Sequence, residues 1–93
     1  MIGSMSGDML WDLVITKPAG RDLRELSRDD LRRVNMAFGA MRRDPYSGDI
    51  KFLRGSGGTL RRRVGVWRIL FAVDQSKRLV VIFGVKRRTS TTY

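Results

Sequence analysis

Residues 61–71 read Arg-Arg-Arg-Val-Gly-Val-Trp-Arg-Ile-Leu-Phe, and this stretch decides the fold of the chain. Gly65 can adopt the backbone conformations of a tight turn, because it has no Cβ. Apolar residues alternate with other residues on both sides of it. The stretch therefore predicts two consecutive antiparallel strands, at residues 59–64 and 67–74, joined by a bend at the glycine.

Side-chain alternation along these strands separates an apolar face from a basic face. The apolar set of the second strand is Trp67, Ile69, Phe71 and Val73. Arg68 therefore points to the opposite face. On the first strand, Arg61 and Arg63 alternate with Arg62, which points with its apolar neighbours. We expect the arginines at 61, 63 and 68 to converge on one open face of a sheet.

Two helices are expected in the first half of the chain. Pro18 can open the first of them, over residues 19–26, because its missing N–H costs nothing there. Ser27 and Asp30 have the spacing of a capping box and start the second helix. The Asp-Pro pair at residues 44–45 stops it. Its apolar stripe consists of Leu31, Val34, Phe38 and Met41.

Three further strands are expected, at residues 9–16, 50–53 and 79–86. The core face of the first strand consists of Trp11, Leu13 and Ile15. The last strand is the most apolar and is expected at the centre of the sheet. The element order predicts an α+β fold, with both helices on one face of a mainly antiparallel sheet. Residues 8–93 would form this single domain, after a disordered N-terminus or tag remnant at 1–7.

All of the excess positive charge lies in the second half of the chain. Residues 1–50 carry eight basic and eight acidic side chains, whereas residues 51–93 carry eleven basic ones and a single acid, Asp74. Like charges on one body repel, so a net charge of +10 does not serve stability. It concentrates polyanions near the surface, which favours a nucleic acid as the partner. A basic surface that serves solubility alone is the alternative.

The composition excludes several kinds of site. The chain contains no Cys and no His, so it has no disulfide, no thiolate zinc site and no imidazole base. We therefore expect neither a metal nor a cofactor. No apolar run reaches the length of a membrane span and no signal peptide is visible, so we expect a cytoplasmic protein without a membrane partner.

Three motifs lie in the second half of the chain. Residues 51–55 form a K-x-L-x-G run, and residues 61–71 contain R-x-R-V-G-x-W-R followed by apolar residues. Val85 is followed by three basic residues at 86–88, and Tyr93 comes after them. With the first strand and the helices, these motifs resemble the RelE/ParE superfamily of toxins from bacterial type II toxin–antitoxin systems. The combination is specific for the superfamily and less specific for a branch within it.

The resemblance implies an activity, that of the branch that cuts messenger RNA in the ribosomal decoding site. The 2′-hydroxyl of the substrate attacks the adjacent phosphate without a metal, and the products carry a cyclic phosphate and a free 5′-hydroxyl. The catalytic residues that the resemblance implies are Arg61, Arg68, Arg88 and Tyr93. The substrate-binding residues that it implies are Lys51, Arg54, Arg63, Lys86 and Arg87.

The implied roles of these residues follow the charge that develops on the phosphate. Arg68 and Arg88 would contact the scissile phosphate. Arg61 and Arg63 would hold the flanking phosphates, and Tyr93 would stack on a base or take part in proton transfer.

The proton acceptor is left open. Arg61 stands where relatives can have Lys, and a guanidinium stays protonated at any usable pH. Lys51, Lys86 and Tyr93 are the alternatives, although ordinary pKa values of these side chains lie at about 10. Neighbouring cations could lower the pKa of Lys86 or Tyr93.

Two other functions stay open, together with the partner that a toxin implies. A ParE-type toxin would bind and poison DNA gyrase without catalytic residues. A plain nucleic-acid-binding module would show strong salt dependence and no turnover. Either kind of toxin implies a cognate antitoxin and an oligomeric complex. An acidic amphipathic segment of the antitoxin would lie on Leu70 and Ala72 of the open face, or in grooves beside the helices.

Overall fold

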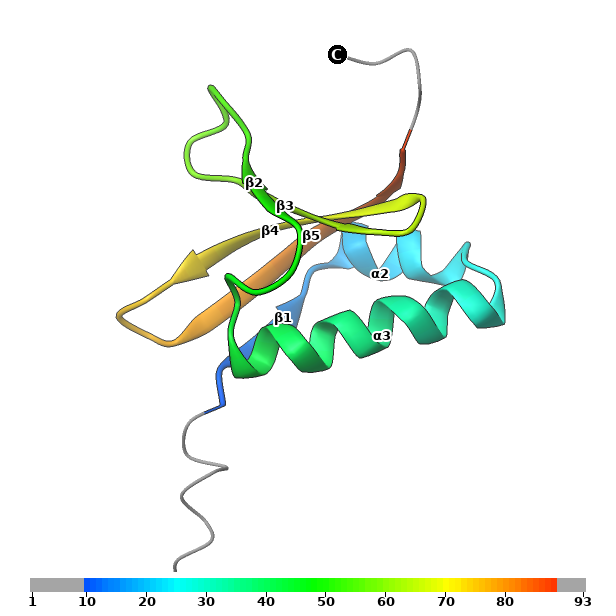
Figure 1. The fold of residues 1–93 in the computed structure, drawn as a ribbon, viewed down its shortest axis with the longest axis horizontal. Coiled ribbons are helices and arrows are strands. Elements are labelled where there is room, and N and C mark those ends of the chain that lie inside the picture. Colours follow the sequence, from blue (N-terminus) through cyan, green and yellow to red (C-terminus); the bar gives the residue numbers. More distant parts are fainter. Residues whose placement is uncertain (1–9, 89–93) are drawn as a thin grey trace, which may run out of the picture.

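The computed structural model describes residues 10–88, and the expected remnant at 1–7 and Tyr93 lie outside that range. Within it, the chain forms a sheet and two helices in the expected order (Figure 1). The elements are β1 (Asp12–Ile15), α2 (Lys17–Arg24), α3 (Arg28–Arg43), β2 (Ile50–Phe52), β3 (Leu60–Val64), β4 (Trp67–Asp74) and β5 (Leu79–Arg87).

The five strands of the described range form one sheet in the order β1-β5-β4-β3-β2. β1 pairs with β5 in parallel, and the other three pairs are antiparallel. The prediction of a mainly antiparallel α+β sheet is therefore confirmed. β5 is an interior strand, as expected for residues 79–86, and β4 is the middle strand of the five. β5 is apolar because it is an interior strand, between β1 and β4, and because α2 packs against it.

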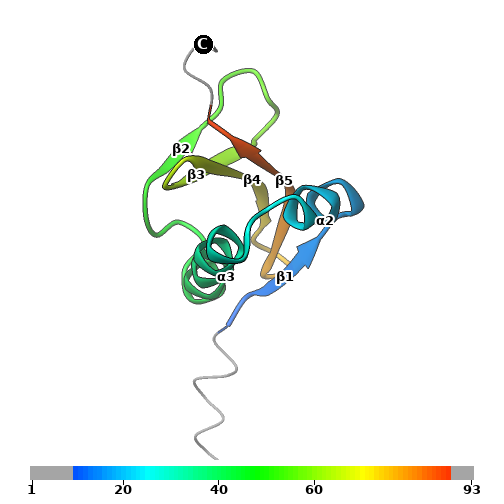
Figure 2. The same cartoon turned by 90° about the vertical axis from the view of Figure 1, so that its right-hand side faces the viewer.

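Both helices lie below β3, β4 and β5 in Figure 1. Figure 2 shows the same arrangement after a turn of 90° about the vertical axis. The core between the helices and the sheet consists of Ala19, Val34, Ala37, Phe38, Met41, Leu60, Ile69, Phe71, Val80, Ile82 and Val85. Burial of these side chains holds the two layers together. The opposite face of the sheet carries neither α2 nor α3.

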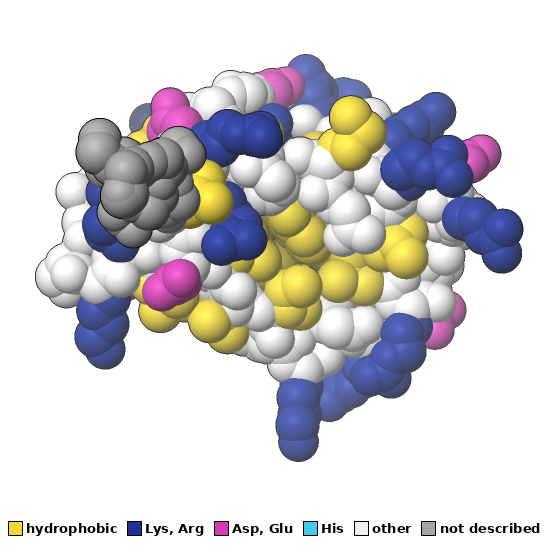
Figure 3. Space-filling view, turned by 90° about the horizontal axis from the view of Figure 1, so that it is seen from below, with side chains coloured by type: hydrophobic (Ala, Val, Ile, Leu, Met, Phe, Trp, Pro, Cys, Tyr) yellow, Lys and Arg dark blue, Asp and Glu magenta, His cyan; other side chains and the backbone are white. Residues whose placement is uncertain are grey.

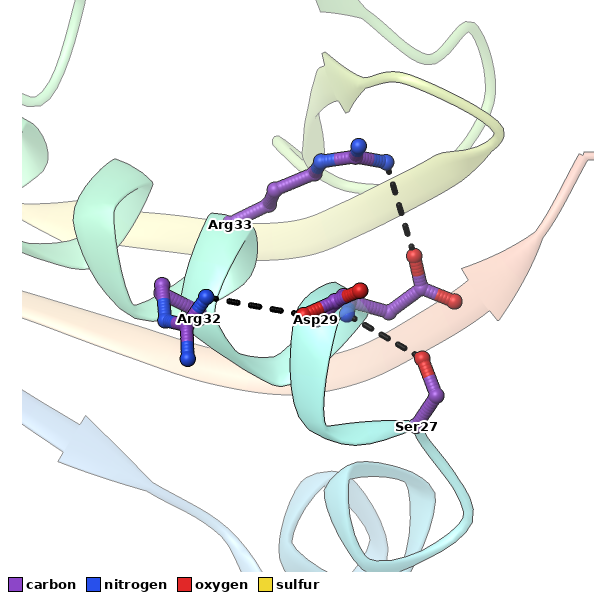
Figure 4. A network of polar contacts seen from close by, with 5 residues as sticks. Ser27, Asp29, Arg32 and Arg33 are labelled. Carbon is purple, nitrogen blue, oxygen red and sulfur yellow. Dashed lines mark hydrogen bonds and ion pairs between the residues drawn. The ribbon is translucent and has the colours of Figure 1, made fainter.

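The start of α3 follows from its sequence (Figure 4). The Ser27 hydroxyl accepts a hydrogen bond from the Asp30 N–H at 3.2 Å, as a capping box requires. Asp29 pairs with Arg32 at 3.5 Å, and Asp30 pairs with Arg33 at 3.7 Å. The two acids also lie in the first turn, where the helix dipole favours negative charge.

The end of α3 is tied to the first strand. Asp44 is the C-cap, as the Asp-Pro pair predicts. The Arg42 carbonyl accepts a hydrogen bond from the Trp11 N–H at 2.7 Å, and the Arg42 side chain donates to the Trp11 carbonyl at 3.0 Å. Arg42, a basic residue in the last turn of α3, thus holds the end of the helix against the segment that leads into β1.

One residue of the expected core is exposed. Trp11 and Leu13 pack against the core, but Ile15 is 42% exposed. β1 is an edge strand, so Ile15 has a neighbouring strand on one side only.

Among residues 10–88, no helix is both long and apolar enough to cross a lipid bilayer.

Candidate nucleic-acid interface

The register of the sheet brings five cations to one face. Lys51 lies opposite Arg61 across β2 and β3. Arg63 lies opposite Arg68, which in turn lies opposite Lys86. Side chains directly opposite each other point to the same face of a sheet. We call this set, on the side away from the helices, the cationic face. It confirms the predicted convergence of the arginines at 61, 63 and 68.

Stability of the sheet does not account for this arrangement. Like charges that are directly opposite across antiparallel strands destabilise a sheet. Arg68 has a cation opposite it on each side, and Lys51 faces another cation. Binding of an anion relieves such repulsion, so the cationic face is suited to a polyanion.

Two acids from the first half of the chain contact this face. The Arg63 Nε donates to Asp49 Oδ2 at 2.9 Å, and Arg61 Nη1 lies 3.9 Å from Asp49 Oδ1. Lys86 Nζ lies 3.2 Å from an Asp22 oxygen. The sequence pointed to Asp74 as the one acid available to pair these cations, which is wrong, because distant chain segments meet here.

Arg63 and Lys86 stay accessible in these ion pairs, whereas the Arg61 side chain is only 14% exposed. The Arg63 side chain is 42% exposed and that of Lys86 is 60% exposed, so water screens both pairs. Exposed pairs of this kind contribute about 0–1 kcal/mol each. A multiply charged ligand can therefore displace them.

The loop between α3 and β2 is pinned by an arginine on the helix side. The Arg62 Nη1 donates to the Ser47 carbonyl at 2.7 Å and to the Ser47 hydroxyl at 3.1 Å. Partial burial lowers the pKa of Arg62. Gly48 has a φ of +84°, and a Cβ on it would lie 2.6 Å from the Arg62 Cζ. This loop leads directly to Asp49, so the anchor fixes where that carboxylate lies.

The open face of the sheet continues as an apolar area beyond the cations. Leu70 lies opposite Gly84, where a Cβ would come within 3.3 Å of its Cδ1. Ala72 lies opposite Val81, which in turn lies opposite Val14 of β1. Val14 is 45% exposed. The open face therefore combines a cationic half with an apolar half.

The helix side has its own exposed hydrophobic area. Figure 3 shows hydrophobic side chains gathered in a hollow on that side, with Lys and Arg side chains around its rim. An open hollow along α3 is lined by Arg28, Leu31, Arg32, Asn35 and Met36. None of these residues belongs to the cationic face.

Two predicted site residues, Arg54 and Arg87, lie off the cationic face. Arg54 lies in the exposed loop between β2 and β3. Arg87 is opposite Trp67, with its guanidinium 5.8 Å from the ring centroid, on the face away from Arg68. Arg88, one residue past β5, donates its N–H to the Val66 carbonyl at 2.6 Å. Tyr93 is outside the described residues.

Sequence reasoning missed Asp22 and Asp49 as partners of the site. The Asp22 carboxylate accepts the Val85 N–H at 2.9 Å, beyond the end of β1, and also pairs with Lys86. No local spacing indicates this contact, because Asp22 and Val85 are 63 positions apart. In the part of the chain that the structure describes, no group of three or more acidic, His or Cys side chains could hold a metal ion.

Known proteins with sequences similar to this chain are toxins. No model of a known protein family matches the chain. The chain is 33% identical over 81 residues to toxin RelG of Mycobacterium tuberculosis, and the match spans 86% of this chain and 93% of the relative.

Solved structures of toxins share the fold of this chain. A chain of the RelBE2 toxin–antitoxin complex from Mycobacterium tuberculosis matches with a TM-score of 0.75 and 34% identity, over 85% of this chain and 99% of that one. The archaeal RelE–RelB complex from Pyrococcus horikoshii OT3 matches with a TM-score of 0.76 over 89% and 100%, and its 23% identity shows the fold alone. Its sequence and its fold together place this chain in the RelE family of toxins.

Proposed function

We propose that this RelE-family toxin acts as a ribosome-dependent endoribonuclease. The observation that carries the proposal is the cationic face, which aligns five basic side chains across four strands. Such a face suits the closely spaced phosphates of a single RNA strand, since each phosphate can meet a separate cation. The relatives named above are RelE toxins, so the alternative of a gyrase poison is not favoured.

The proposed reaction needs positioning and charge stabilisation more than it needs a special nucleophile. The 2′-hydroxyl of the RNA attacks the adjacent phosphorus, the bond to the 5′-oxygen breaks, and that oxygen takes up a proton. Arg68 and Arg88 are proposed to stabilise the charge that develops on the phosphate. Arg61 and Arg63 are proposed to hold the flanking phosphates.

The proton acceptor in this scheme is a side chain with an ordinarily high pKa or a group of the ribosome. Lys51 and Lys86, two of the candidates, both lie on the cationic face. Tyr93 is the third candidate. A pH–rate profile of Tyr93→Phe that is identical to that of the unaltered protein excludes the tyrosine.

An antitoxin is the proposed protein partner, in an oligomeric complex. Two of the solved relatives are complexes of a toxin with an antitoxin. The apolar half of the open face, which includes Leu70 and Ala72, adjoins the cationic half. An acidic amphipathic segment could cover both halves and block the site. The proposed location is the cytoplasm, where messenger RNA is translated.

The test is a translation reaction with purified ribosomes, one defined messenger RNA and the purified protein. We expect cleavage at specific codons, with a 5′-hydroxyl on the downstream fragment that a polynucleotide kinase can label directly. Free RNA without ribosomes serves as the control and should be cut far more slowly. An unchanged messenger RNA in the presence of folded protein contradicts the proposal.

A further inference from the structure

Asp49 binds two arginines as a phosphate would. Its Oδ2 accepts a hydrogen bond from Arg63 Nε at 2.9 Å, and its Oδ1 lies 3.9 Å from Arg61 Nη1. An anionic group with two oxygens between two guanidinium groups is also the arrangement in which arginines bind a phosphodiester. The Asp49 side chain is 50% exposed, so the carboxylate meets these cations from the solvent side.

The position of this carboxylate is fixed by the backbone. The Arg63 N–H donates to the Asp49 carbonyl at 3.0 Å. Two residues earlier, Ser47 is held by the side chain of Arg62 through its carbonyl and its hydroxyl. Gly48 between them has a φ of +84°, a backbone conformation that favours glycine. The pairing is therefore a feature of the fold and not of one mobile surface side chain.

We propose that Asp49 is an internal phosphate mimic, which occupies an RNA phosphate position on the cationic face and is displaced when RNA binds. The inference rests on the proposed function, because it assumes that RNA phosphates bind to Arg61 and Arg63. An exposed ion pair is weak, so a polyanion that meets several cations at once displaces it. Asp49 thus lowers the affinity for RNA and speeds release.

The experiment measures binding of a 2′-O-methyl RNA oligomer, which cannot be cut, by fluorescence anisotropy at fixed ionic strength. Asp49→Asn keeps the size of the side chain and removes its charge. We expect its affinity to rise about two- to fivefold, the range that one exposed ion pair accounts for. Asp49→Ser should bind the oligomer as tightly as Asp49→Asn does. The affinity of Asp49→Glu, which restores a carboxylate, should return toward that of the unaltered protein.

Asp29→Asn is the matched control. It also removes one negative charge and one exposed ion pair, with Arg32 at 3.5 Å, but on α3 and away from the cationic face. Its affinity should change less than that of the Asp49 variant. Equal tightening in both variants overturns the inference, because a general change in net charge then accounts for the effect.

A double-mutant cycle tests the route of the effect. In an Arg63→Gln background, removal of the Asp49 carboxylate should give little tightening, since its principal partner is gone. Unchanged or weaker binding by a folded Asp49→Asn protein overturns the inference and leaves the proposed function standing. Failure of the unaltered protein to bind the oligomer also overturns the inference, whereas the proposed function is decided by the cleavage assay on ribosomes.

Discussion

Consecutive arginines at residues 61, 62 and 63 differ in role because strand alternation separates them. Arg61 and Arg63 lie on the cationic face and contact Asp49. Arg62 points to the helix side and anchors the loop that carries this aspartate. The middle arginine therefore acts on structure, whereas its neighbours are placed to act on a ligand.

A substitution of Arg68 tests the catalytic assignment. We expect Arg68→Gln to lower the rate of messenger RNA cleavage by about a hundredfold, the effect of removing one donor that stabilises transition-state charge. The measurement is single-turnover cleavage on ribosomes. Arg32→Gln, which removes the same charge from α3, is the control and should keep nearly full activity. A loss of equal size in the control would contradict the assignment.

A side chain at residue 48 should destabilise the fold. Its φ of +84° strains any other residue, and a Cβ there would collide with the Arg62 guanidinium. We expect Gly48→Ala to lower the free energy of unfolding by about 1–3 kcal/mol, measured in urea. Gly20→Ala in α2 meets nothing within 4 Å and should raise it by about 0.5–1 kcal/mol. Equal effects of the two alanines would contradict this account.

At the scale of elements, the turn between β4 and β5 depends on a carboxylate. The Asp74 Oδ1 accepts hydrogen bonds from the Ser76 hydroxyl at 2.8 Å and from the Lys77 N–H at 3.2 Å. These bonds, that of Ser76 above all, lower the pKa of Asp74 from its ordinary value. The charged form therefore stabilises the turn.

This pKa shift predicts a pH-dependent effect of Asp74→Asn. A carboxylate with a lowered pKa stabilises the fold above its unfolded pKa of about 4, and the effect is lost as the pH falls through its folded pKa. The variant should melt below the unaltered protein at pH 7, and the two melting curves should converge toward pH 2. Ser76→Ala should also melt below the unaltered protein at pH 7, by a smaller difference in melting temperature. A difference between Asp74→Asn and the unaltered protein that stays constant from pH 7 to pH 2 would argue against this role.

Local sequence patterns predicted most of the elements of the fold. Ser27 and the apolar stripe of α3 define a helix on their own, and Gly65 marks the turn between β3 and β4. The predicted bounds of β4 agree with the structure at both ends. The convergence of Arg61 and Arg68 also followed, because strand alternation is local information.

Pairings between distant segments could not be predicted in the same way. Nothing in residues 79–86 shows that β1, and not another strand, pairs with one edge of β5. The contact between Asp22 and Lys86 depends on how α2 packs beside β5. The same holds for Asp49, which meets its arginines only because Arg62 fixes the preceding loop. Tertiary packing decides these features.

For the whole molecule, a net charge of +10 on 93 residues implies strong self-repulsion. We expect the melting temperature to rise by a few degrees when sodium chloride is raised from 20 to 200 mM, because salt screens repulsion. Inorganic polyphosphate should raise it further at constant ionic strength, since a bound anion stabilises the folded state. A polycation such as polylysine is the control and should have no such effect. A lower melting temperature with polyphosphate would contradict this prediction.

The parallel pairing of β1 with β5 constrains how the protein is made. Of the five described strands, β1 is synthesised first, and its neighbour β5 is synthesised last. Both helices therefore leave the ribosomal exit tunnel before β5, against which α2 packs. A nascent chain that stops short of residue 79 has no strand with which to pair its first one, so the sheet should form completely only after β5 has been synthesised.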